Sequence, residues 1–124
     1  MEMKFYVCKI CGNIISYVKR SGVKVICCGQ EMEEITPNTV DASLEKHVPV
    51  VNVTNGKVIV RIGGAEHPMV PEHYIEWVAL QTSKGNQRKE LHPGQKPEVE
   101  FCLMPGDKVE NVYAYCNLHG LWKA

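Results

Sequence analysis

The chain has 124 residues, enough for one ordinary domain or for a modest domain joined to a very small one. Its 14 basic and 14 acidic residues cancel, so the composition gives no sign of the basic surface that nucleic-acid binding needs. Residues 1–5 contain no signal-peptide core and no stretch approaches the length of a membrane span, which predicts a cytoplasmic protein without a membrane partner. Because cytosolic thiols stay reduced, the 6 cysteines predict metal ligands and not disulfides.

Residues 1–36 are predicted to form a small domain around four cysteines. Residues 4–7 have the pattern of a short strand, and residues 14–19 and 23–26 that of a hairpin around Ser21 and Gly22. About 36 residues bury too little apolar surface to fold unaided, so a bound metal is expected to stabilise them, although free thiols or redox partners are the alternative. The cysteines have the spacing of a tetrathiolate metal site, with Cys8, Cys11, Cys27 and Cys28 as ligands.

The adjacent pair Cys27 and Cys28 departs from the two Cys-x-x-Cys pairs of ordinary zinc ribbons. Neighbouring side chains on an extended strand point in opposite directions, so both sulfurs can reach one metal only if the chain bends there. Tetrahedral thiolate coordination suits either iron or zinc, and the four cysteines leave that choice open.

Residues 37–40, which include Pro37, are predicted to be a linker, and residues 41–124 have the pattern of a second, all-β domain. Asn55-Gly56 is the strongest hairpin signal, and Val58, Val60 and Ile62 alternate with exposed positions as on the buried face of a strand. Short strands with Gly and Pro between them predict an antiparallel sandwich. Strands are expected at residues 48–54, 57–62, 75–82, 98–103 and 109–115.

A second candidate metal site begins with Cys116 and His119, which end the apolar run at residues 112–115. A short turn lets a Cys-x-x-His pair point to one place, and three more histidines, His47, His67 and His73, occupy similar loop positions. Five donors exceed the tetrahedral preference of structural zinc, whereas iron accepts five or six ligands. The set therefore predicts an iron site with one position left open.

Taken in order, these residues resemble the desulfoferrodoxins, the two-iron class of superoxide reductases. The resemblance covers nearly the whole chain and rests on Cys8-x-x-Cys11, Cys27-Cys28, Glu45-Lys46-His47-Val48-Pro49, Glu66-His67-Pro68, His73 and Cys116-Asn117-x-His119-Gly120. It implies an immunoglobulin-like seven-stranded sandwich, two iron ions per chain, and four imidazoles in a plane with an axial thiolate. The implied activity is reduction of superoxide to hydrogen peroxide without release of oxygen. A rubredoxin-like electron donor and a homodimer are implied as well.

Two charged residues precede the ligand His47. Most such pairs are solvated loop charges, but a Lys46 charge about 6 Å from the iron would contribute roughly 2–3 kcal/mol to the field on an anion at an effective dielectric near 20. The resemblance implies that Glu45 binds the open position in the oxidised form. His92 is predicted to be exposed in a turn and not a ligand, and Cys102 to be half-buried in a strand.

Two other functions are compatible with these motifs. One is a rubredoxin-like electron-transfer protein in which both irons carry electrons, and the other is a zinc-stabilised interaction module. Zinc would leave the protein colourless, whereas thiolate-bound ferric iron absorbs visible light, and reactivity with superoxide separates an enzyme from a carrier.

Overall fold

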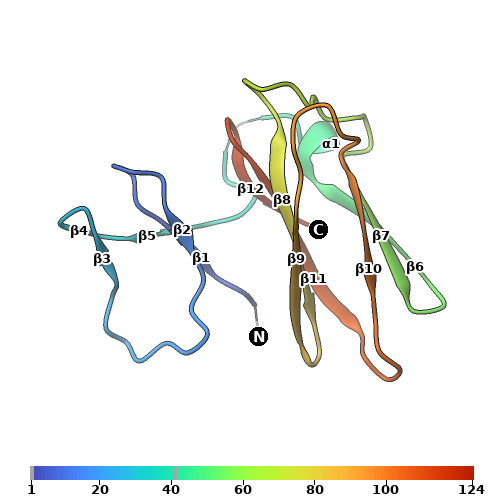
Figure 1. Cartoon of the computed structure of the whole chain (residues 1–124), viewed down its shortest axis with the longest axis horizontal. Coiled ribbons are helices and arrows are strands. Elements are labelled where there is room, and N and C mark those ends of the chain that lie inside the picture. Colours follow the sequence, from blue (N-terminus) through green and yellow to red (C-terminus); the bar gives the residue numbers. More distant parts are fainter. Residues whose placement is uncertain (1, 41) are drawn as a thin grey trace. The chain divides into compact units, whose positions relative to one another are not determined.

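The computed structural model describes residues 2–40 and 42–124 and divides the chain into two compact units, Met1–Thr36 and Pro37–Ala124 (Figure 1). Residues 1 and 41, the first residues of the two predicted domains, lie outside the described part. Almost every element is a strand, and the one helix among the described residues is the single turn α1 (Leu44–His47). The predicted all-β class is confirmed. No helix in the described part is long and apolar enough to cross a membrane.

The described residues of unit 1 form five very short strands in two antiparallel groups. One group has the order β2-β1-β5 and the other is the pair β3-β4. The bounds are β1 (Phe5–Val7), β2 (Ile14–Ile15), β3 (Ile26–Cys27), β4 (Gln30–Glu31) and β5 (Glu33–Ile35).

The predicted hairpin between residues 14–19 and 23–26 is wrong. β2 pairs with β1, and β3 pairs with β4 across the two residues Cys28 and Gly29. These two residues have φ values of 53° and 75°, as the type I′ turn of a two-residue hairpin requires. This tight turn closes at a small entropic cost and reverses the chain directly after Cys27. The bend predicted at the adjacent cysteines is therefore confirmed.

The hydrophobic core of unit 1 is small. Tyr6, Cys8 and Met32 form a buried cluster, with Ile15 and Tyr17 packed against it. So few buried side chains give little hydrophobic stabilisation, which makes a metal at the cysteines important for the fold.

In unit 2, the part of the chain that the structure describes forms seven strands in two antiparallel sheets, ordered β10-β7-β6 and β12-β11-β8-β9. Its β6–β7 turn lies at Asn55 and Gly56, where the sequence places it. The strands are β6 (Pro49–Thr54), β7 (Lys57–Ile62), β8 (Ile75–Thr82), β9 (Gly85–Glu90), β10 (Glu98–Cys102), β11 (Val109–Cys116) and β12 (Gly120–Lys123).

The core of unit 2 is formed by side chains that alternate along β7, β8, β10 and β11. Val58, Val60 and Ile62 are buried, as their alternation predicts, and they belong to one cluster with Phe101. Cys116, at the end of β11, belongs to the same cluster and is completely buried. The core thus reaches to the loops that carry the candidate ligands.

Two strands of unit 2 were not expected from the sequence. β9 holds the charged residues Arg88 and Lys89 and pairs only with β8 at the edge of its sheet. Neither face of β9 is buried, so its sequence shows no alternation. β12 is short and starts directly after the ligand loop. Cys102 is exposed, and not half-buried as expected, because it alternates with the buried Phe101.

The predicted linker is bound to unit 2 along β12. The backbone N–H of Asn38 donates to the Leu121 carbonyl at 3.0 Å. Its side chain both donates to the Lys123 carbonyl at 3.0 Å and accepts from the Lys123 N–H at 2.8 Å. Asn38 therefore acts as an extra, one-residue partner of the edge strand.

Candidate metal centres

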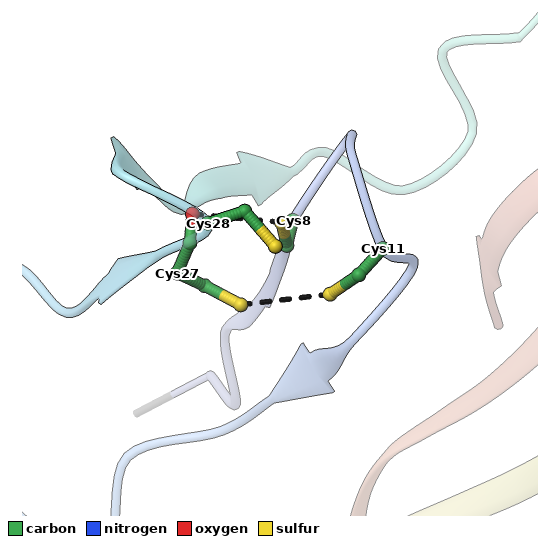
Figure 2. A group of neighbouring side chains, drawn as sticks. All are labelled: Cys8, Cys11, Cys27 and Cys28. Carbon is green, nitrogen blue, oxygen red and sulfur yellow. Dashed lines mark hydrogen bonds between the residues drawn. The ribbon is translucent and has the colours of Figure 1, made fainter.

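The four cysteines of unit 1 come together at the two turns, with all four sulfurs within 4.8 Å of one another (Figure 2). Cys11 Sγ and Cys27 Sγ are 3.5 Å apart. Sulfurs bound tetrahedrally at a metal–sulfur distance of about 2.3 Å would be roughly 3.8 Å apart, so the cluster has the size of a tetrathiolate site. None of the cysteines forms a disulfide.

Backbone N–H groups favour the thiolate form of Cys8 in this cluster. The N–H of Cys11, with a smaller contribution from Ile10, lowers the pKa of Cys8 to about 6. Sharing of hydrogen bonds with Cys11 raises the pKa of Cys28 to about 12, since the four sulfurs cannot all ionise without a cation. The Nδ2 of Asn13 donates to Cys27 Sγ at 3.6 Å, a sulfur ligand contact that the sequence motif does not reveal.

The second group of donors lies at one end of the unit 2 sandwich, where α1 and the loops meet, away from the β6–β7 turn (Figure 1). His47 ends α1, and Val48 is extended because Pro49 follows it. His67 and His73 lie in the loop between β7 and β8, and Cys116 is the last residue of β11. The ligand atoms of His47, His67, His73 and Cys116 are all within 4.8 Å of one another.

His119 is not one of these four residues, but its ring lies next to two of them. Its Nδ1 is 3.1 Å from Nε2 of His47 and 4.0 Å from Sγ of Cys116. Two nitrogens bound at right angles about 2.1 Å from one ion would be about 3.0 Å apart, which matches the first distance. The structure therefore brings all five expected donors of unit 2 together.

The four imidazoles form a closed ring in the order His47, His67, His73, His119. Neighbouring centroids are 4.7, 4.7, 5.0 and 4.9 Å apart, and neighbouring planes are 73–89° apart. The opposite pair His47 and His73 is 6.3 Å apart with only 28° between planes. Four near-equal sides with a longer diagonal describe a square of rings around a common centre.

Hydrogen bonds fix which nitrogen faces that centre. His47 Nδ1 donates to the Ser43 carbonyl at 2.6 Å, and His67 Nδ1 donates to the Pro68 carbonyl at 2.7 Å. A carbonyl only accepts, so Nε2 carries the free lone pair in both rings. Nε2 of His67 and of His73 is buried and has no hydrogen-bond partner within the described residues. Buried nitrogens without partners are costly unless a cation binds them.

Burial favours the uncharged form of three of the histidines. Desolvation lowers the pKa of His47, lowers that of His73, and lowers that of His67 to about 4. Desolvation also raises the pKa of Cys116, while the backbone N–H groups of Leu118 and His119 act against it. Metals bind the neutral form of imidazole, so histidines with lowered pKa values suit a cation site.

A three-residue hairpin loop sets Cys116 and His119 side by side. Cys116 pairs with Gly120 across the loop, and Gly120 has a φ of +79°. Hairpins with three-residue loops usually need a left-handed residue at this position, which glycine provides. The spacing Cys-x-x-His-Gly is thus the sequence of a turn that presents two ligands.

Gly63 brings the backbone before His67 into close contact with the backbone around His47. Gly63 has a φ of +81°, and a Cβ on it would lie 2.5 Å from the carbonyl oxygens of Lys46 and Ala65. Its N–H donates to the Val48 carbonyl at 3.2 Å, and Ala65 N–H donates to the Glu45 carbonyl at 3.2 Å. Only glycine allows this contact, which holds the start of the His67 loop against the end of α1.

The remaining residues singled out from the sequence fall into two groups. Glu45 and Lys46 are exposed on α1 beside the cluster, and the charge of Lys46 is a minor cause, after burial, of the lowered pKa of His47 and His73. His92 is exposed in the turn after β9, and neither it nor Cys102 belongs to either donor cluster of the described residues. Trp122 and Asn117 also contact the ligand loops. Asn117 lies within the Cys116-x-x-His119 motif, whereas no sequence signal pointed to Trp122.

The desulfoferrodoxin family model matches residues 39–124, and the model of the desulfoferrodoxin N-terminal domain matches residues 1–35. The chain belongs to the desulfoferrodoxin family. A desulfoferrodoxin from Syntrophotalea carbinolica is 42% identical over 123 residues, covering 99% of this chain and 96% of the relative. The resemblance drawn from the motifs is confirmed.

Solved structures of superoxide reductases are also similar to this chain. The superoxide reductase from Treponema pallidum has a TM-score of 0.84 and 41% identity, and the match covers 100% of this chain and 99% of that chain. The superoxide reductase (1Fe-SOR) from Giardia intestinalis has a TM-score of 0.55 and 33% identity, covering 64% of this chain and 95% of the other. As a desulfoferrodoxin with both donor clusters formed, the chain fits two iron sites.

Proposed function

We propose that this protein is a superoxide reductase whose reaction centre is the unit 2 cluster of His47, His67, His73, His119 and Cys116. The observation that carries the proposal is the square of four imidazoles, with adjacent centroids 4.7–5.0 Å apart, beside a fully buried thiol. Family membership and the superoxide reductases among the similar structures support it.

These five donors would hold a ferrous ion, which would supply the one electron that, with two protons, converts superoxide to hydrogen peroxide; the Cys116 thiolate would favour the ferric state. The protein's own part is to keep the imidazoles neutral, which the desolvation of His47, His67 and His73 does. It also supplies the sulfur ligand Cys116, whose thiolate form the N–H groups of His119 and Leu118 favour against the burial that raises its pKa. No oxygen is released in this reaction, in contrast to dismutation.

Lys46 and Glu45 are proposed as the charged residues of the reaction centre. The Lys46 charge contributes to the lowered pKa of two ligand histidines, which supports a position from which it raises the local concentration of an anion. Glu45 is proposed as the carboxylate that takes the open position in the oxidised protein. Both side chains are exposed and belong to the same helical turn as His47.

Cys8, Cys11, Cys27 and Cys28 are proposed to hold the other iron, which is accessory and serves structure or electron relay. A rubredoxin-like donor is proposed as the source of electrons. Cys11 and Cys28 are exposed and neighbour the exposed apolar side chains of Ile10 and Ile26, which suits docking of a small redox protein.

A homodimer and a cytoplasmic location are proposed on similar grounds. Val18 and Val23 of unit 1 expose large apolar surface, which a second copy would cover. Six free cysteines are typical of a reducing compartment. Analytical ultracentrifugation tests the dimer, and fractionation of the native host tests the location.

Pulse radiolysis of the fully reduced protein, with peroxide and oxygen quantified, tests the function. We expect a fast second-order reaction that yields one peroxide for each superoxide and no oxygen. Cys116→Ser and His119→Ala are expected to abolish it while the visible spectrum of the tetrathiolate iron persists. Evolution of oxygen would indicate a dismutase, and no reaction would favour the electron-carrier alternative.

A further inference from the structure

Asn117 makes three hydrogen bonds across the metal-binding end of unit 2. Its side-chain Oδ1 accepts from the Tyr74 N–H at 2.9 Å, and its Nδ2 donates to the Glu72 carbonyl at 3.0 Å. Its backbone N–H donates to the Tyr74 carbonyl at 3.2 Å. One amide side chain thus uses both its donor and its acceptor on one short segment of backbone.

The two residues that Asn117 contacts flank His73 on either side. Asn117 itself follows Cys116 directly and precedes His119 by two residues. The segments that it joins are 43 residues apart along the chain between Tyr74 and Asn117. Three of the five donors, His73, Cys116 and His119, therefore lie on the two chain segments that the Asn117 side chain connects.

His73 depends on its backbone for its position more than His47 and His67 do. The rings of His47 and His67 are oriented by hydrogen bonds to Ser43 and Pro68. The His73 ring has no hydrogen bond within the described residues, and its Nε2 is buried without a partner. Apart from the bonds to Asn117, its segment is held by the paired bonds between His73 and Val70 at 3.0 and 3.1 Å.

We propose that Asn117 is a positioning residue that sets the distance between His73 and the Cys116–His119 loop, and thereby the size of the five-donor site. It binds no metal itself. The residue must be both donor and acceptor at short reach, which asparagine is. Aspartate would keep the bond from Tyr74 N–H but would turn an oxygen toward the Glu72 carbonyl, and alanine would lose both side-chain bonds.

The test uses the full-length, metal-free protein and Co²⁺ as the probe, read from the visible bands of thiolate-bound cobalt. For Asn117→Ala we expect Co²⁺ affinity at the unit 2 site to fall about tenfold to a hundredfold, with a changed cobalt–thiolate band. The four-cysteine site of the same chain is the internal reference and is expected to keep its affinity. Asn86→Ala, an exposed asparagine in β9, is the matched control and is expected to change neither site.

Asn117→Asp keeps one of the two side-chain bonds and is expected to weaken binding less than alanine does. It also keeps the test decisive if Asn117→Ala does not fold. Unchanged Co²⁺ affinity and an unchanged band at the unit 2 site in a folded Asn117 variant would overturn the proposal, even if the variant melts earlier. The inference rests on the proposed five-donor site, but no superoxide is used, so its failure is distinguishable from failure of the proposed activity.

Discussion

The indole ring of Trp122 lies nearly parallel to the imidazole of His47, with 4.8 Å between centroids and 25° between planes. Its Nε1 donates to the His119 carbonyl at 3.1 Å, and none of its surface is exposed. His47 and His119 are 72 residues apart in the chain. One buried side chain of β12 therefore supports two proposed iron ligands at once.

Two replacements of Trp122 are expected to distinguish the contribution of the ring stack from that of the hydrogen bond. Trp122→Phe keeps an aromatic ring against His47 but leaves the His119 carbonyl without its donor, and we expect unfolding free energy to fall by about 1–2 kcal/mol. Trp122→Ala also leaves a cavity, and a loss of about 3–5 kcal/mol is expected. Urea denaturation of the metal-free protein measures both. Equal losses in the two variants would mean that the ring stack contributes nothing.

Gly63→Ala is expected to disrupt the contact between α1 and the His67 loop. The new Cβ would meet two carbonyl oxygens at 2.5 Å on a backbone with φ +81°, so we expect a loss of at least about 2 kcal/mol in unfolding free energy. Gly85→Ala is the control, because a Cβ there meets nothing within 4 Å, and a change below about 1 kcal/mol is expected. A Gly63 variant as stable as the Gly85 variant contradicts the assigned role.

Lys46→Ala is expected to slow the reaction with superoxide and to flatten its dependence on salt. Loss of one positive charge beside the site weakens attraction of an anion, and a fall of about threefold to tenfold at low ionic strength is expected. Lys84→Ala removes the same charge at the far end of β8, about 25 Å from His73, and serves as control. Pulse radiolysis over a salt series decides, and equal effects of the two variants would exclude a local role for Lys46.

Cys28→Ser is expected to damage the tetrathiolate site and to spare the reaction centre. A hydroxyl is a poor replacement for a thiolate ligand, so we expect loss of the visible bands of the first iron and a lower melting temperature of unit 1. The rate with superoxide should stay near that of the parent protein. Cys102→Ser, which changes an exposed thiol outside both clusters, should alter neither property. Complete loss of the superoxide reaction in Cys28→Ser would make the first iron essential.

Acid is expected to destabilise the metal-free protein below pH 6.5. The pKa of His67 is lowered by burial from 6.5 to about 4, so between these values the unfolded chain binds a proton that the folded one does not. Stability from this group is therefore complete above pH 6.5 and declines as pH falls toward 4. Unfolding free energies measured from pH 7 to pH 4 should drop more in the parent than in His67→Gln. Parallel curves would show that His67 is not the group responsible.

The spacing of residues within short stretches was enough to predict several turns and ligand motifs. Cys8-x-x-Cys11, the Asn55-Gly56 turn and the Cys116-x-x-His119-Gly120 loop each act within a few residues, where chain geometry leaves few conformations. The alternation of Val58, Val60 and Ile62 gave the buried face of β7 for the same reason, since the side-chain period of a strand is two.

Pairings between distant segments had no such local signal. β2 pairs with β1 and not with residues 23–26, because the left-handed turn at Cys28 and Gly29 directs β3 to β4. β9 carries no alternation because neither of its faces is buried. Pairing of this kind depends on which neighbour the folded sheet offers.

The amino-acid sequence alone determined the donor types, their order and the family, because ligand chemistry and tight turns are properties of short stretches. Only the tertiary structure decided how the donors are held. The ring order, the contact of Gly63 with Lys46 and the supports from Trp122 and Asn117 all join segments that are well separated along the chain. Such contacts form only when packing of the two sheets brings those segments to the same end of the sandwich.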